Sequence, residues 1–83
     1  MGMREETYVL TDFGYCYYDT ELNIIYNLYV FQKYRRQGKA RELVEIASSK
    51  LKDPIKIQAE PRENSISVTN LVSFYKRLGL EVI

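Results

Sequence analysis

The spacing of apolar residues changes at Gly38, and this change constrains the fold more than any other feature of the chain. Before Gly38, runs rich in tyrosine and isoleucine are separated by turn residues, which is typical of strands. After it, the apolar residues recur every three or four positions, at Ala40, Leu43, Val44, Ala47 and Leu51. This spacing predicts a helix that packs one apolar face against the preceding strands.

Five strands are predicted along the chain. They are expected at residues 7–10, 14–18, 24–31, 55–60 and 80–83. The third run is too continuously apolar to be an exposed edge, so it is expected inside the sheet. A turn is expected at residues 61–64.

The two predicted helices have recognisable ends. The first should run from Gly38 to the Asp53-Pro54 pair, because the residue before a proline disfavours helical angles. The second should start at Ser65 or Ser67 and end before Gly79, which suits the left-handed position that terminates a helix.

The predicted order is βββ-α-β-α-β, an α/β (α+β) fold with a mixed twisted sheet. The two alternations of strand and helix after residue 24 predict parallel pairing in that half of the sheet. Because the chain has 83 residues and no repeat or linker, residues 1–83 are expected to form a single domain.

Positive charge is concentrated where the third strand gives way to the first helix. Five basic residues with no acid among them lie there: Lys33, Arg35, Arg36, Lys39 and Arg41. Residues 1–32 carry a net charge of −4, and from residue 42 onward acids and bases balance. Helix starts ordinarily favour acids, so this inversion predicts an anionic partner.

A helix start preceded by glycine can hold a phosphate, because its first backbone N–H groups lack partners in the helix. The groups concerned belong to Gln37, Gly38, Lys39, Ala40 and Arg41. Neither GxxxxGK[ST] nor GxGxxG is present, which excludes the common nucleotide-binding turns. The alternative is a solvated basic turn.

Composition excludes several kinds of chemistry. The chain has no histidine and one cysteine, Cys16, which excludes Ser-His and Cys-His hydrolases and any internal disulfide. No metal site is expected. No apolar run approaches the roughly 20 residues that span a bilayer, and the N-terminus lacks a secretion signal, so a cytoplasmic location is expected.

Two motifs resemble those of a known family. RRQGKA at 35–40 is similar to the Q/R-x-x-G-x-G/A signature of the GNAT superfamily of N-acetyltransferases. LYV at 28–30 and RELVEIA at 41–47 resemble the flanking strand and helix, and FYKRLGLE at 74–81 resembles the family's xYxxxGF helix end. The likeness covers residues 14–83. The chain also resembles very short phage-borne GNAT proteins, some of which are anti-CRISPR enzymes.

The resemblance implies a minimal GNAT fold with splayed parallel central strands, acetyl-CoA as donor, and acetyl transfer to a primary amine. It places the diphosphate on residues 37–41, beside Arg35 and Arg36. The pantetheine arm would bond the backbone of Leu28 and Val30, with the Leu28 N–H facing the acetyl carbonyl.

Tyr75 matches the family's tyrosine that gives a proton to the departing thiolate. It also falls on the apolar face of the second helix. Both roles can hold, because a tyrosine ring can pack in the core while its hydroxyl reaches a polar site.

The chain departs from the family pattern in ways that matter for function. No glutamate lies on residues 24–31, so the general base is unassigned among Asp19, Glu21, Glu60 and a water relay. The family's first strand and two helices have no counterpart, which suits a protein lysine as acceptor. The sheet edge left exposed would allow a homodimer.

Two other function classes compete with acetyl transfer by direct attack in a ternary complex. One is a catalytically weak or inactive CoA-binding module that acts through protein interaction. The other is nucleic-acid binding through the basic turn, which ranks last because no extended basic track is visible.

Overall fold

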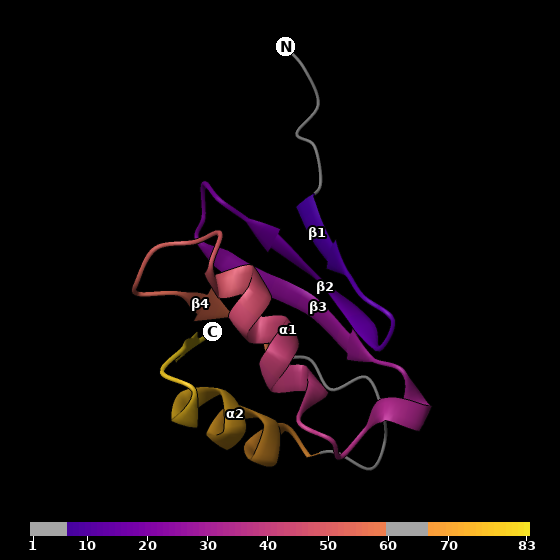
Figure 1. The fold of residues 1–83 in the computed structure, drawn as a ribbon. Coiled ribbons are helices and arrows are strands. Elements are labelled where there is room, and N and C mark those ends of the chain that lie inside the picture. Colours follow the sequence, from indigo (N-terminus) through magenta and orange to yellow (C-terminus); the bar gives the residue numbers. More distant parts are fainter. Residues whose placement is uncertain (1–6, 60–66) are drawn as a thin grey trace.

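The computed structural model describes residues 7–59 and 67–83, which form a mixed sheet with helices packed on it (Figure 1). The elements are β1 (Thr7–Leu10), β2 (Gly14–Asp19), β3 (Ile24–Val30), η1 (Gln32–Tyr34), α1 (Lys39–Ser48), β4 (Lys56–Ile57), α2 (Val68–Arg77) and β5 (Glu81–Val82). The predicted order βββ-α-β-α-β is confirmed, and the short 3-10 helix η1 is an addition to it.

The sheet has the order β1-β2-β3-β4-β5. The first three strands pair antiparallel, and β3, β4 and β5 pair parallel, so the predicted mixed sheet with β3 inside it is confirmed. Right-handed crossovers that step in the same direction place α1 and α2 on the same face of the sheet.

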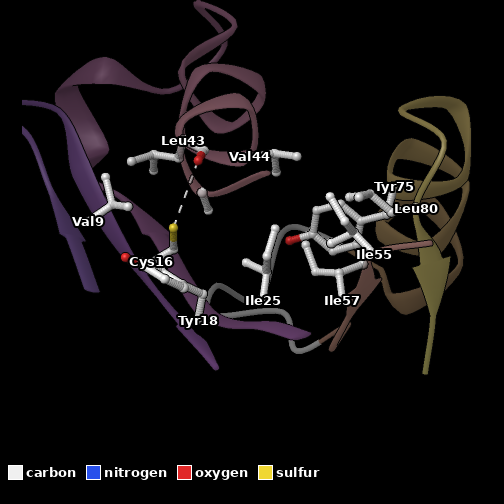
Figure 2. Close-up of a cluster of buried hydrophobic side chains, with 11 residues drawn as sticks. Val9, Cys16, Tyr18, Ile25, Leu43, Val44, Ile55, Ile57, Tyr75 and Leu80 are labelled. Atoms are coloured by element: carbon white, nitrogen blue, oxygen red, sulfur yellow. Dashed lines mark hydrogen bonds between the residues drawn. The ribbon is translucent and has the colours of Figure 1, made fainter. Parts of the chain in front are cut away.

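The core lies between that face and the helices, as Figure 2 shows. Cys16, Ile25 and Ile57 are fully buried on the sheet, and they meet Leu43 of α1 and Tyr75 of α2. Gly14 leaves room for the neighbouring backbone of β3 and for Leu43 of α1. A Cβ there would lie 2.3 Å from the Tyr29 carbonyl oxygen and 3.1 Å from Cδ1 of Leu43.

The first helix starts where the sequence predicts and ends earlier. Its N-cap is Gly38, with φ of 74°, but its last residue is Ser48, so the predicted end at Asp53-Pro54 is wrong. The backbone N–H groups of Lys50 and Leu51 donate to carbonyls three residues back, at 3.0 Å each, which tightens the final turn. This turn still brings Leu51 against the core.

The fourth strand is shorter than predicted. Only Lys56–Ile57 pair as β4, instead of residues 55–60. Glu60 and the predicted turn at 61–64 lie outside the described residues.

The second helix follows its sequence signals. Ser67 is its N-cap, and the Ser67 Oγ accepts a hydrogen bond of 3.1 Å from the Asn70 N–H. The alternative start at Ser65 lies outside the described residues. Gly79 has φ of 86°, as expected for a residue that ends a helix. In the described part of the chain, neither helix is long and apolar enough to cross a membrane.

Candidate active site

A β-bulge in β3 shapes the centre of the sheet. Tyr15 pairs with Tyr29 and Tyr17 pairs with Tyr26, so β3 has one residue more than β2 between these two pairs. Asn27 lies in this interval with φ of 56°, a left-handed conformation that asparagine tolerates better than most residues. Such bulges bend a strand away from its regular course.

The bulge changes which backbone groups face β4. Before it, the Asn23 and Ile25 carbonyls accept from N–H groups of Lys56 and Gln58, both at 3.0 Å. Beyond it, Phe31 donates its N–H in the opposite direction, to the Phe13 carbonyl at 2.9 Å. Strand alternation therefore turns the backbone groups of Leu28 and Val30 toward the β4 side.

No described strand pairs with this part of β3 on the β4 side. Among the described residues, β4 supplies partners only to Ile24 and Ile25. Pairing between β3 and β4 thus ends at Ile25 and Ile57, just before the bulge at Asn27. The backbone groups of Leu28 and Val30 that face this side are therefore unpaired by any described strand.

Asn23 fixes the opposite end of the same strand pair. Its side-chain amide donates to the carbonyls of Lys52 and Pro54, and its Oδ1 accepts from the Lys52 N–H at 3.0 Å. These contacts anchor the segment that leads into β4 to the start of β3. The two strands are therefore held together before the bulge.

The start of α1 has free backbone donors. From Arg36 through Arg41, no backbone N–H donates a hydrogen bond to a residue in the described ranges, and no side chain caps the helix. The next amide, that of Glu42, donates to the Gly38 carbonyl at 3.3 Å. A Cβ at Gly38 would have nothing within 4 Å. A group bearing phosphate oxygens fits this donor set.

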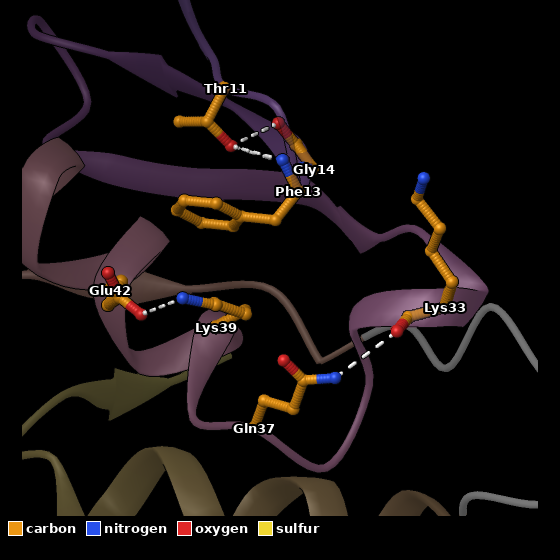
Figure 3. Close-up of polar contacts among 7 residues, drawn as sticks. All are labelled: Thr11, Phe13, Gly14, Lys33, Gln37, Lys39 and Glu42. Carbon is orange, nitrogen blue, oxygen red and sulfur yellow. Dashed lines mark hydrogen bonds and ion pairs between the residues drawn. The ribbon is translucent and has the colours of Figure 1, made fainter.

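The basic side chains of the turn differ in what they contact (Figure 3). The Lys39 ammonium lies 3.0 Å from the Glu42 carboxylate and 5.0 Å from the centre of the Phe13 ring. Arg41 pairs with Glu45 at 3.6 Å, as the helical spacing predicts. Glu42 in the first turn therefore offsets part of the positive charge that the sequence places there.

Arg36 differs from the other basic residues of the turn. In residues 7–59 and 67–83, its side chain has no ion pair, hydrogen bond or ring contact, and it is exposed on a left-handed backbone with φ of 64°. Lys33 lies 5.1 Å from the centre of the Tyr34 ring, and Gln37 donates to the Lys33 carbonyl at 3.2 Å. Arg36 is thus the cation of the turn with most freedom to meet an anion.

Arg35 supports the end of β3 in this structure. Its Nε donates to the Val30 carbonyl at 3.0 Å, and its guanidinium lies 5.2 Å from the centre of the Tyr29 ring. Arg35 thus joins the basic turn to the end of β3, whose backbone beyond the bulge is not paired with β4 in the described residues. The Val30 carbonyl is occupied by this contact, whereas the Val30 N–H faces the β4 side.

Tyr75 is buried, and its hydroxyl lacks a protein partner in the described part of the chain. The residue is only 3% exposed. Figure 2 shows its ring extending from α2 with the hydroxyl pointing toward Ile25, the last residue of β3 that pairs with β4. Buried polar groups are nearly always hydrogen-bonded, so a hydroxyl without a partner indicates a functional group or a bound molecule.

The interior around Tyr75 favours neutral side chains. Burial, with a further contribution from nearby Cys16, raises the pKa of Tyr75 from 10.0 to about 12. Burial likewise raises the pKa of the Cys16 thiol from 9.0 to about 11. Tyr75 therefore keeps its proton throughout the neutral pH range.

The acidic candidates for a general base have other contacts or lie outside the described residues. The Asp19 Oδ1 accepts hydrogen bonds from the N–H groups of Glu21 and Leu22, at 2.8 and 3.1 Å. The Asp19 carboxylate therefore helps to form the turn between β2 and β3. Glu60 lies outside the described ranges. Within those ranges, no group of three or more Cys, Asp or Glu residues could hold a metal ion.

Asn27 is the residue of this site that the sequence prediction missed. The signal was available, because Asn27 is the single polar residue in the run IIYNLYV. A polar residue that tolerates the left-handed region, set inside an apolar strand, is typical of a bulge.

Comparison with known proteins agrees with this geometry. A family model described as an acetyltransferase (GNAT) domain matches residues 4–82, nearly the whole chain. No curated protein and no solved structure matches the chain. GNAT acetyltransferases use acetyl-CoA as their acetyl donor, and the unpartnered amides at the start of α1 fit its phosphate groups. The chain belongs to the GNAT family of N-acetyltransferases.

Proposed function

We propose that this acetyltransferase modifies the side-chain amine of a lysine on a protein, and that Tyr75 and the Leu28 backbone act in the transfer. The observation that carries the proposal is the buried Tyr75 hydroxyl, which points to the place where β3 and β4 stop pairing. A catalytic acid must lie within hydrogen-bond reach of the atom that it protonates, and among the described residues this hydroxyl has no other partner.

The binding groups come from three parts of the chain. The N–H groups of Lys39, Ala40 and Arg41 would hold the diphosphate at the positive end of α1, with Gln37 and Gly38 beside them. Arg35 and Arg36 would add charge. The backbone of Leu28 and Val30 would bond the pantetheine amides as an added strand does.

The reaction balances without a metal or a covalent enzyme intermediate. The neutral amine forms the new C–N bond with the acetyl carbon, and the C–S bond breaks. Leu28 N–H would stabilise the negative charge that develops on the carbonyl oxygen, an effect worth about 3–4 kcal/mol in other enzymes. Tyr75 would give its proton to the departing sulfur, the amine proton would pass to water, and Tyr75 would regain a proton from water, which leaves an N-acetyl amine, a free thiol and the enzyme unchanged.

Burial would raise the pKa of this acid and that of its proton acceptor together. A free thiol in water has a pKa of about 8.5, well below that of Tyr75. Burial raises the pKa of Cys16 to about 11, and a leaving sulfur shielded from water in the same way would gain proton affinity similarly. The raised pKa of Tyr75, about 12, would then be offset in part by the raised proton affinity of the sulfur.

The side of the sheet that the described helices leave open supports a protein acceptor. The described helices both cover one face, so the other face can admit a large substrate. A cytoplasmic site of action and a homodimer formed through a sheet edge stay predictions. Asp19, Glu21 and Glu60 stay candidates for the base, beside a water relay.

An assay with labelled acetyl-CoA and acceptors of increasing size tests the acceptor. We expect transfer to lysines of a protein mixture to exceed transfer to free lysine and polyamines at equal amine concentration by at least about tenfold, since contacts remote from the amine add to binding of the transition state. Mass spectrometry would locate the acetyl groups.

The opposite preference would overturn the assignment of a protein acceptor. Faster transfer to free amines would indicate a small-molecule acetyltransferase. Acetyl-CoA binding without transfer to any amine would favour the CoA-binding module instead.

A further inference from the structure

The sheet face opposite the helices carries an array of aromatic rings. We call the tyrosines of this array the tyrosine face; they are Tyr8, Tyr15, Tyr17, Tyr26 and Tyr29. Strand alternation directs them away from the buried Val9, Cys16 and Ile25. In the described part of the chain, no helix covers this face.

One row of the tyrosine face crosses three strands. Tyr8 pairs with Tyr17, and Tyr17 pairs with Tyr26. Their ring centres lie 5.8 and 5.7 Å apart, which makes a continuous strip from the β1 edge to β3. Tyr8 is the most open of the three, at 58% exposed.

This row reaches the transfer site from the side that the helices leave open. Tyr26 is adjacent in β3 to Ile25, whose side chain points to the opposite face, toward the Tyr75 hydroxyl. The helix-covered face at this level is filled by buried Ile25, Ile57 and Tyr75. An acceptor that avoids unpacking the core therefore approaches over the tyrosine row.

The negative charge around the tyrosine row favours a positively charged ligand. Residues 7–31 contain Asp12, Asp19 and Glu21 and neither lysine nor arginine. In the next row across the sheet, Asp19 pairs with Ile24, Ile24 pairs with Lys56, and Lys56 pairs with Glu81. This row therefore contains two acids and one base. Aromatic faces attract cations as well, and the tyrosine face already holds one, because the Arg35 guanidinium lies 5.2 Å from the centre of the Tyr29 ring. Two further contacts of this kind occur outside this face, at Tyr34 and Phe13.

We propose that the tyrosine face, centred on the row Tyr8, Tyr17 and Tyr26, docks a basic protein segment and presents one of its lysines for acetylation. The proposal rests on the proposed function and names the class of its acceptor. Nucleic acid fits poorly, because phosphates would be repelled by the acids of residues 7–31. A second copy would bring the same negative charge against itself.

Peptides that differ only around the acceptor test the charge preference. Each carries one central lysine, flanked by arginine, glutamine or glutamate, since arginine supplies charge without a second acceptor amine. We expect the arginine-flanked peptide to have a kcat/KM at least about tenfold above that of the glutamate-flanked one, with a gap that narrows as salt is added. Equal values for the three peptides would overturn the proposal.

Matched variants test the rings themselves. Tyr8→Leu with Tyr17→Leu should raise the KM for the arginine-flanked peptide about tenfold, since two ring contacts with cations are lost. Tyr8→Phe with Tyr17→Phe keeps the rings and should stay within about twofold of the native protein. The KM for acetyl-CoA should not change in either variant. An unchanged peptide KM in the leucine variant contradicts the docking site.

Direct binding separates this proposal from the catalytic one. An arginine-flanked peptide with norleucine in place of lysine should bind to the native protein and to the phenylalanine variant in a calorimetric titration. Peptide binding without any acetyl transfer would refute the proposed function and leave the docking site standing. If the leucine variant does not fold, the native protein and the phenylalanine variant still decide.

Two further results would overturn the docking site in favour of another occupant. One is oligothymidylate binding that is tighter than that of the arginine-flanked peptide and weaker in the leucine variant. The other is a dimer, seen by sedimentation, that the leucine substitutions dissociate.

Discussion

Replacing Gly38 with glutamate is expected to weaken acetyl-CoA binding by at least about 100-fold. The new carboxylate would stand at the start of α1, in space that is empty within 4 Å of the Cβ position. It would repel the diphosphate and compete for the N–H groups of Lys39, Ala40 and Arg41. Loss of two charge-assisted hydrogen bonds, each worth about 1.5–3 kcal/mol, accounts for an effect of this size. Calorimetric titration of each variant with acetyl-CoA measures it.

Gly79 offers a matched control for this substitution. It also has a left-handed backbone, with φ of 86° against 74° for Gly38, and a Cβ there would likewise have nothing within 4 Å. Gly79→Glu introduces the same backbone strain and the same charge at the end of α2. We expect its acetyl-CoA affinity to stay within about twofold of the native value. Equal losses in both variants would show that strain, rather than the anion site, explains the effect.

Replacing Tyr75 with phenylalanine is expected to lower kcat by about 100-fold and to leave acetyl-CoA affinity unchanged, because general acids contribute about 10²–10⁴ to rate. The unfolding free energy should stay the same or rise. The hydroxyl has no hydrogen-bond partner in the described residues, and burying such a group costs about 1–3 kcal/mol. A structural role would give the opposite pair of results, lower stability with full turnover.

The pH dependence of the reaction provides a second readout for Tyr75. With its pKa raised to about 12, Tyr75 stays protonated below that value and remains a competent acid. The amine must lose its proton to attack, and lysine does so near about 10.4. We therefore expect kcat/KM to rise with pH up to about 10 without a falling limb. A falling limb near neutral pH that disappears in Tyr75→Phe would contradict the raised pKa of Tyr75.

The local signals in the sequence were sufficient for the order of elements. The change of spacing at Gly38, the cap at Ser67 and the glycine at position 79 all act within a few residues, so they can be read without knowledge of the fold. The cluster of five bases likewise marked the turn before α1, and the resemblance to the GNAT family gave that turn its expected role.

The features that the sequence left undetermined depend on contacts between distant segments. The end of α1 at Ser48 depends on how the following turn brings Leu51 to the core. The length of β4 depends on the bulge at Asn27 of β3, about thirty residues earlier in the chain. The helix and strand propensities of the residues alone do not determine the end of α1 or the length of β4.

The side chains of the basic turn show the same limit. The five bases are equivalent in the sequence, yet Lys39 and Arg41 face Glu42 and Glu45, Arg35 holds the Val30 carbonyl, and Arg36 is exposed. The ion pairs follow helical spacing, whereas the Arg35 contact arises from the path of η1 back toward β3. The site residues themselves stay predictions until the donor is bound.

The most direct test of the site is an NMR titration of the ¹⁵N-labelled native protein with acetyl-CoA, which reports on each backbone amide. We predict saturable shifts at Lys39, Ala40 and Arg41 together with Leu28, all described by one dissociation constant, because one molecule would span α1 and β3. Shifts that leave the start of α1 and Leu28 unchanged, or that do not saturate, would contradict the placement of acetyl-CoA between these two elements.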